Sequence, residues 1–257
     1  MRRGSRPGDG AVKRSDERRS LESIAPRYFS PELAGANELY HQHLRDAVIP
    51  PEGGESALEI GCGKGMWTSV LCERYDTVDV VDASASLLSG VRRLAEGKRA
   101  TLATHLSLIE DFHPAPGQVW DHVYMTFILE HLLSPGAVLR KLKTMLRPGG
   151  RLFVTVPNAR SVHRVVAVRM GLIGSVYDLS DNDRSLGHRR VYCAKRLGAL
   201  LSRTGYRVTD RKSVGLKPLT LKQLEPLPPE LIRAYCDSGD LCGAHGAYIA
   251  LRATPAP

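Results

Sequence analysis

The stretch L-E-I-G-C-G-K-G (Leu58–Gly65) and the run V-D-V-V-D (Val78–Asp82) decide the fold of this chain. An apolar run that stops at closely spaced glycines predicts a strand, a tight turn and then a helix, with a backbone that can approach a ligand closely. A carboxylate about 20 residues further on predicts the tip of the neighbouring strand, where Asp82 can accept both hydroxyls of a ribose. Together the two stretches predict a nucleoside-binding crevice.

The spacing of the glycines distinguishes between nucleoside cofactors. A dinucleotide-binding turn reads G-x-G-x-x-G, whereas here Gly65 comes two residues after Gly63. Lys64 is followed by glycine rather than by Ser or Thr, so the phosphate-loop pattern does not apply either. We therefore expect a poor fit for a pyrophosphate. An ordinary tight turn with incidental glycines is the alternative, and Glu59 and Asp82 in their places argue against it.

Strand-like and helix-like segments alternate from residue 57 to about residue 214, a pattern typical of a parallel sheet with crossover helices. Strands are expected at 57–61, 77–82, 101–106, 122–127, 151–156, 206–214 and 247–253. Helices are expected at 65–74, 84–95, 135–146 and 195–204, with Pro148-Gly149-Gly150 ending the third. The sequence therefore predicts a single α/β domain.

The domain organisation follows from composition. Residues 1–20 contain seven basic and three acidic groups and almost no apolar side chains, so a disordered basic tail is expected there. Residues 21–54 are expected to form an N-terminal helical cap, and residues 55–257 the main domain. Two long interruptions of the main domain, 158–192 and 216–245, exceed ordinary loop lengths and are predicted to be lids over a substrate mouth.

The charge and the cysteines limit the class of protein. The net charge of +9 allows contact with nucleic acid or anionic lipid, although the tail alone supplies +4 of it. No run approaches the ~18 apolar residues of a membrane span. The five cysteines show no paired framework, and Cys236, Cys242 and His245 do not match a zinc-ligand spacing. A reducing, cytoplasmic setting is expected.

Two parts of the chain carry a family resemblance. The segment A-L-E-I-G-C-G-K-G resembles motif I of the class I S-adenosylmethionine (SAM) methyltransferases. The segments 120–123, 127–132 and 145–158 are similar to later regions of the branch with ubiquinone-biosynthesis O-methyltransferases and antibiotic-tailoring enzymes. The resemblance spans roughly residues 55–210. It implies a Rossmann-like sheet of seven mostly parallel strands with helices on both faces and an antiparallel last strand. It also implies methyl transfer from SAM to O or N of a small-molecule acceptor, with antibiotic biosynthesis as one setting.

The same resemblance implies the residues that bind the cofactor. They are Glu59, Gly61, Cys62, Gly63, Gly65, Asp82, Ala83, Glu110, Asp111, Phe112, Met125 and Thr126. Asp82 would hold the ribose, and either Glu110 or Asp111 would accept the exocyclic amine of the adenine. Phe112 would stack on the adenine ring. Met125 and Thr126 would lie under the methionine moiety.

Catalytic candidates are fewer. His188 and His131 are candidate general bases, and Tyr192 a candidate for orienting the acceptor. The alternatives are a structurally packed His131 and a solvated turn that includes His188. Five other histidines have no motif support and are expected to be surface or capping residues, namely His41, His43, His105, His113 and His163. No metal is expected, because Glu130-His131 follows Phe127-Ile128 where the ubiquinone relatives carry acids, and two ligands rarely hold a hard cation.

Two other functions stay open at the level of sequence. A nucleic-acid (RNA) methyltransferase would explain the positive charge, but the chain has no amino-methylation signature and no appended binding module. A non-catalytic SAM-fold binding protein is the third possibility. Residues 161–176 have an amphipathic helix pattern, which fits a lid or a peripheral lipid contact. Either a monomer or a homodimer is compatible with the sequence.

Overall fold

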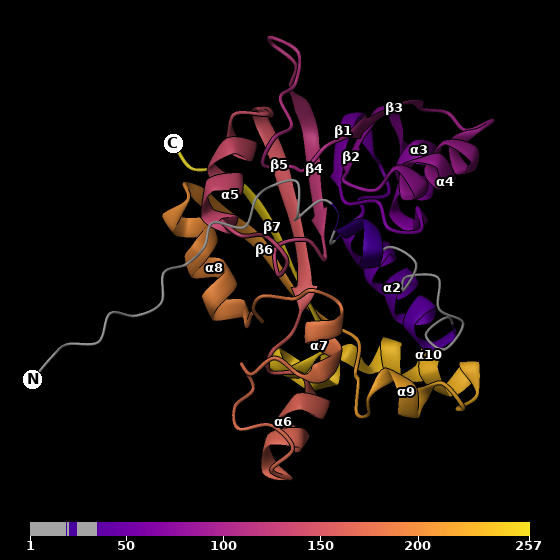
Figure 1. Ribbon diagram of the computed structural model, residues 1–257, viewed down its shortest axis with the longest axis vertical. Coiled ribbons are helices and arrows are strands. Elements are labelled where there is room, and N and C mark those ends of the chain that lie inside the picture. The colour runs from indigo at the N-terminus through magenta and orange to yellow at the C-terminus, as the bar shows by residue number, and fades with distance from the viewer. Residues whose placement is uncertain (1–18, 20, 25–34) are drawn as a thin grey trace, which may run out of the picture.

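The computed structural model describes residues 19, 21–24 and 35–257, so the expected disordered tail lies almost wholly outside the described residues. A seven-stranded sheet in the order β3-β2-β1-β4-β5-β7-β6 forms the centre of the molecule (Figure 1). The strands are β1 (Gly54–Ile60), β2 (Tyr75–Asp82), β3 (Thr101–Leu106), β4 (Trp120–Thr126), β5 (Leu146–Pro157), β6 (Tyr206–Val214) and β7 (Tyr248–Pro255). The Rossmann-like sheet is confirmed: β1 to β5 pair in parallel, and β7 runs antiparallel to β5 and β6.

Helices cover both faces of the sheet, because both faces of its inner strands are apolar. One face packs against α3 (Met66–Arg74) and α4 (Ala85–Ala95), the other against α5 (Pro135–Lys143) and α8 (Ala194–Arg203). Successive residues of one strand belong to opposite cores: Ala57 packs on the α3 side and Leu58 on the α5 side. The side chain of Ser84 accepts a hydrogen bond from the Leu87 amide, which starts α4 where the sequence predicts it.

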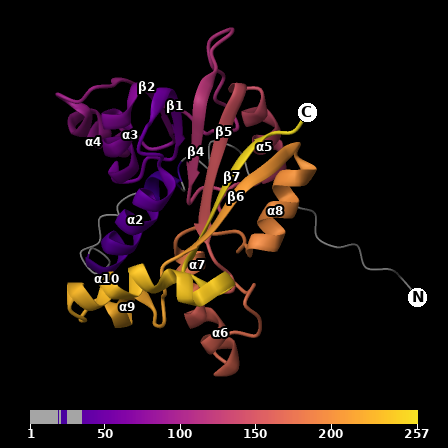
Figure 2. The same cartoon turned by 180° about the vertical axis from the view of Figure 1, so that it is seen from behind.

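The two predicted insertions carry the remaining helices. The first insertion contains α6 (Val162–Arg169) and α7 (Asp181–Ser185), and the second contains α9 (Leu221–Leu224), α10 (Pro229–Asp237) and the 3-10 segment η3 (Ser238–His245). In both views α9 and α10 lie beside α2 (Gly35–Val48), the helix of the N-terminal cap (Figures 1 and 2). The Glu225 carboxylate accepts hydrogen bonds from the amides of Gly35 and Ala36 at 3.0 and 3.1 Å. The second insertion therefore fixes the start of α2.

Two predicted helices are too long. The helix predicted over 135–146 ends at Lys143, since Leu146 is drawn into the sheet opposite Trp120. The residues 148–150, expected to end that helix, lie within β5. The amphipathic pattern over 161–176 forms a helix only as far as Arg169, and the chain then reverses at Gly171, whose φ is +72°. In both cases tertiary pairing or backbone conformation overrides the side-chain pattern.

A single buried carboxylate links three strands of the sheet. Asp79 on β2 accepts a hydrogen bond from the indole Nε1 of Trp120 on β4 at 2.9 Å. Its other oxygen pairs with Nε2 of His105 on β3 at 2.6 Å. Because Trp120 is fully buried, its N–H has no water to replace Asp79.

Asp79→Ala is expected to lower the free energy of unfolding by about 1–3 kcal/mol, the cost of leaving a buried donor unsatisfied. Urea unfolding measures it. Trp120→Phe removes the donor, so adding Asp79→Ala to that variant should cost less than it does in the natural chain. Additive losses in the double variant would show that the Asp79–Trp120 hydrogen bond contributes nothing.

Candidate active site

A cavity of about 490 Å³ opens at the carboxyl ends of the parallel strands. Its walls are the glycine turn after β1, the end of β2, the loop after β3 and the loop after β4, closed by residues of α2. This is where parallel α/β sheets place ligands, because the strand ends and the helix N-termini meet there. Nine of the fifteen predicted site residues line the cavity, namely Gly61, Cys62, Gly63, Gly65, Asp82, Ala83, Glu110, Thr126 and His131.

The glycine turn adopts a backbone that only glycine tolerates well. Gly61, Gly63 and Gly65 have φ angles of +77°, +49° and +82°. A Cβ on Gly61 would lie 2.1 Å from Cδ1 of Ile128, in the loop after β4. The turn therefore packs directly against the neighbouring loop.

The Asp82 carboxylate is fixed at the tip of β2. One oxygen accepts a hydrogen bond from the Cys62 amide at 2.9 Å, and the other accepts from the Ser84 amide at 2.8 Å. Burial raises the pKa of Asp82, and these hydrogen bonds oppose the rise. The spacing in sequence thus becomes a direct contact between the carboxylate and the glycine turn.

Glu59 lies beneath the turn, in full burial, rather than on the cavity wall. Its Oε2 accepts a hydrogen bond of 2.6 Å from the hydroxyl of Thr68 in α3. Burial raises the pKa of Glu59 to about 8, although the Thr68 hydrogen bond lowers it in part. Glu59 therefore carries a proton at neutral pH, and its hydrogen bond with Thr68 links β1 to α3 beneath the glycine turn.

Three other predicted cofactor contacts also lie off the cavity wall. Met125 is fully buried in the sheet, and Phe112 packs between the rings of His105 and Trp120. Of the two acids, Glu110 lines the cavity and Asp111 does not. A stacking role for Phe112 would require its ring to leave the core, so this geometry speaks against that prediction.

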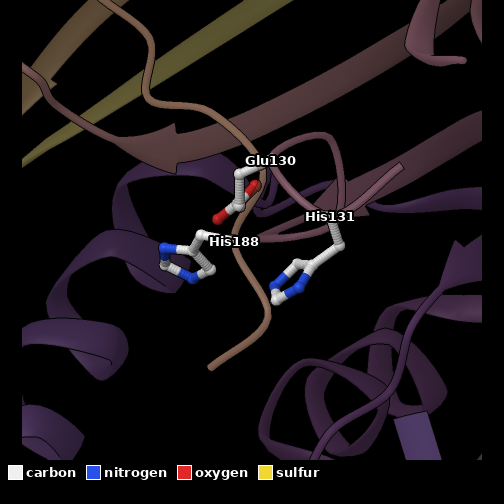
Figure 3. Close-up of side chains that lie close together, drawn as sticks. All are labelled: Glu130, His131 and His188. Carbon is white, nitrogen blue, oxygen red and sulfur yellow. The ribbon is translucent and has the colours of Figure 1, made fainter. Parts of the chain in front are cut away.

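The candidate catalytic residues come together from two distant segments (Figure 3). Glu130 and His131 follow β4, and His188 ends the first insertion; the rings of the two histidines lie 4.8 Å apart at 83°. The His188 side chain is only 9% exposed, so the solvated-turn interpretation is wrong. His131 lines the cavity, and His188 lies behind it. Tyr192 is buried near Glu130, with the Arg190 side chain beside its hydroxyl.

The cluster has unusual electrostatics. Both Glu130 oxygens are buried with no hydrogen-bond partner in another described residue, and Nδ1 of His131 is buried beside the Gly187 backbone. Burial raises the pKa of Glu130 to about 7, with the neighbouring His188 opposing the rise. Burial, reinforced by His188, lowers the pKa of His131 to about 3, so His131 is neutral at physiological pH. Unpaired buried polar groups of this kind are found at functional sites.

Comparison with known proteins fits this geometry. Residues 33–211 match the family model described as a methyltransferase domain. The chain belongs to this family. It is therefore a class I methyltransferase, the class whose methyl donor is SAM.

The chain is similar in sequence to curated methyltransferases and similar in fold to solved structures of lower identity. The ubiquinone biosynthesis O-methyltransferase of Aeromonas salmonicida (strain A449) is 28% identical over 209 residues, which cover 78% of this methyltransferase and 84% of the relative. The solved DhpI-SAM-HEP complex has a TM-score of 0.58 at 15% identity, covering 96% of this chain and 100% of that one. The [4+2]-cyclase SpnF has a TM-score of 0.55 at 18% identity, covering 84% and 81%. At such identities the two structures share the fold alone.

The structure brings a third possible ligand group to the Glu130–His131 pair. Glu130, His131 and His188 each offer an atom that could bind a metal ion, and these atoms lie within 4.8 Å of one another. The set of two imidazoles and one carboxylate suits a transition metal better than Mg²⁺. The sequence could not show this, because His188 is 57 residues from His131.

The N-terminal helix supplies wall residues that sequence reasoning missed. His41, expected at the surface, lines the cavity and stacks on Phe127 with ring centroids 4.6 Å apart. Asn37 and Arg45 of the same helix also line it. Phe127 also has a φ of +56°, a conformation that is uncommon for a residue other than glycine, so the backbone is unusual where it meets α2.

The described helices of this methyltransferase include none with the length and apolarity needed to cross a bilayer.

Glu59→Gln should flatten the pH dependence of stability. The unfolded chain releases the Glu59 proton near pH 4.5 and the folded protein near pH 8, so stability falls as the pH rises through this window. Gln stays neutral and can still accept from Thr68. Urea unfolding from pH 5 to 8 should show the variant gaining on the natural protein by up to a few kcal/mol. Glu55→Gln, on the exposed end of β1, is the matched control, and parallel curves for Glu59→Gln would contradict the assignment.

Proposed function

We propose that this methyltransferase transfers the methyl group of SAM to an oxygen or nitrogen of a small-molecule acceptor. The observation that carries the proposal is that the glycine turn, Asp82 and His131 line one cavity, and that Glu130 and His188 lie next to His131 behind the cavity wall. The part of the cavity formed by the glycine turn and Asp82 fits a nucleoside. The cluster offers groups able to accept a proton. A tailoring step in secondary metabolism, in the cytoplasm, belongs to the proposal and rests on the family resemblance.

In the cofactor half, Asp82 binds the two ribose hydroxyls and Glu110 the exocyclic amine of the adenine. Amides of the glycine turn and Thr126 hold the methionine end. SAM supplies an electrophilic methyl group, and the protein's task is to align it with the acceptor and to exclude water. Such alignment is worth roughly 7–11 kcal/mol of the barrier.

In the acceptor half, the cluster takes the proton that an O–H or N–H acceptor loses as the new bond to carbon forms and the carbon–sulfur bond breaks. His131 faces the cavity, and Glu130 and His188 lie against it. A positioned general base contributes about 10²–10⁴-fold. Tyr192, which is buried near Glu130, orients the acceptor or the cluster.

The shape of the cavity favours a small acceptor over a nucleic acid. Polar residues of α2 line it together with the apolar Leu21 and Ile24, so one side of the cavity is closed by the N-terminal part of the chain. A base of a folded RNA would need an open, basic approach. The similarity to a cyclase means that the fold alone does not decide the reaction. The proton-accepting cluster is the reason to prefer catalysis over binding alone.

Asp82→Ala is expected to weaken SAM binding by about tenfold or more, because a charged hydrogen-bond acceptor for the ribose is lost. Isothermal titration calorimetry measures the affinity. Asp76→Ala at the exposed start of β2, where the residue forms an ion pair with Arg99, is the control and should leave the affinity unchanged. Equal affinity in the natural protein and in a folded Asp82→Ala variant would reject the ribose role.

Chelation is expected to leave the methylation rate unchanged, because displacement at a sulfonium needs no Lewis acid. The test is the rate of methyl transfer after EDTA treatment and after addition of Zn²⁺, Mn²⁺ or Mg²⁺. A loss of activity that a cation restores, and that Glu130→Gln makes unrestorable, would instead show a metal held by the cluster. SAM affinity, measured alongside, separates this result from loss of the cofactor.

A further inference from the structure

Asp183 in the first insertion has one oxygen committed to three donors. Its Oδ2 accepts hydrogen bonds from the amide of Ser180 at 2.9 Å, from the hydroxyl of Ser180 at 2.7 Å and from NH1 of Arg164 at 3.0 Å. The first belongs to the capping box that starts α7, in which the Ser180 hydroxyl also accepts a hydrogen bond from the Asp183 amide at 3.1 Å. Its Oδ1 lies 2.9 Å from Nδ1 of His188. Asp183 is 7% exposed, so water does not compete strongly for these positions.

Arg164, which donates a hydrogen bond to Asp183, is itself fixed by hydrogen bonds to backbone carbonyls. Arg164, on α6, donates from Nε to the Val176 carbonyl at 3.1 Å and from its other terminal nitrogen to the Asp178 carbonyl. Although burial opposes ionisation of Asp183, the hydrogen bonds from His188 and Ser180 and the Arg164 guanidinium lower its pKa well below the ordinary value. The carboxylate is therefore charged, and it is an acceptor on both oxygens.

Asp183 constrains His188 in two ways. The His188 amide donates to the Asp183 carbonyl at 2.9 Å, which sets the position of the backbone. A carboxylate that only accepts requires Nδ1 of His188 to carry a proton. In the neutral ring Nε2 is then the nitrogen with a lone pair. That ring lies against His131 and Glu130 (Figure 3).

We propose that Asp183 is a positioning residue, which holds His188 in the tautomer protonated on Nδ1 so that Nε2 serves as the proton acceptor of the cluster. The proposal rests on the proposed function for the role of the cluster in methyl transfer. It gives the first insertion a task beyond covering the acceptor: α6 and α7 supply Arg164 and Asp183, which set the chemistry of a side chain behind the cavity wall.

An Asp183→Asn substitution tests this because its effect on the tautomer follows from the donors. Ser180 and Arg164 present N–H groups to Oδ2, so the amide oxygen of Asn must take that place. The NH₂ group then faces His188 and can only donate, which forces Nδ1 to accept and moves the ring proton to Nε2. The variant keeps the capping interaction and reverses the histidine, so a purely structural role for Asp183 predicts no reversal.

The first readout is the tautomer, which needs no substrate. Two-dimensional ¹⁵N–¹H spectra of the ¹⁵N-histidine-labelled full chain are recorded at about pH 9, above the ordinary histidine pKa. His188→Asn identifies the signal. We expect an Nδ1-protonated ring in the natural protein and an Nε2-protonated ring in Asp183→Asn. The same tautomer in both proteins, or an Nε2-protonated ring in the natural protein, would overturn the proposal.

The second readout is turnover on a panel of phenol and amine acceptors. Asp183→Asn should lower kcat by about 10²–10⁴-fold, with SAM affinity unchanged by calorimetry. Asp181→Asn removes the same charge from an exposed position of α7 and should leave both quantities unchanged. Reversal of the tautomer with full kcat would overturn the role of Nε2. In the remaining outcome the tautomer reverses in Asp183→Asn while the natural protein methylates no acceptor of the panel. This outcome would leave the positioning role intact and reject the proposed function.

Discussion

The contact on which the rest of the site depends is the hydrogen bond from the Cys62 amide to the Asp82 carboxylate. It joins the turn after β1 to the tip of β2, and the other oxygen of Asp82 binds the amide of Ser84, at the start of α4. Parallel strands bring their carboxyl ends to one edge, so the turn, the carboxylate and the following helix converge there. Without this convergence the glycines would form only a turn.

The two sides of the site are built in different ways. The glycine turn and Asp82 belong to short loops at the ends of neighbouring strands, whereas the Glu130–His131–His188 cluster needs a loop after β4 and the end of a long insertion. Arg164 and Asp183 give that insertion a polar framework of its own. This division agrees with the chemistry, because every class I enzyme binds the same cofactor and the acceptor differs.

The N-terminal helix completes the enclosure. Its start is fixed by Glu225 of the second insertion, and the hydroxyl of Tyr40 donates to the Leu216 carbonyl. The inner side of α2 then presents His41 to the cavity, stacked on Phe127. Segments near the two ends of the chain thus cooperate to cover one mouth, and the positive φ of Phe127 marks where β4 turns towards them.

The sequence by itself determined the sheet, the glycine turn and the place of Asp82, because those depend on local φ requirements, strand alternation and a fixed spacing along the chain. It did not determine where the helix after Pro135 ends, since Leu146 joins the sheet by pairing with Trp120. Only the tertiary structure brought His41 to the cavity and Asp183 to His188. Those contacts come from helices and insertions whose packing has no period in the sequence, so the side chains that face one another appear only once the chain has folded.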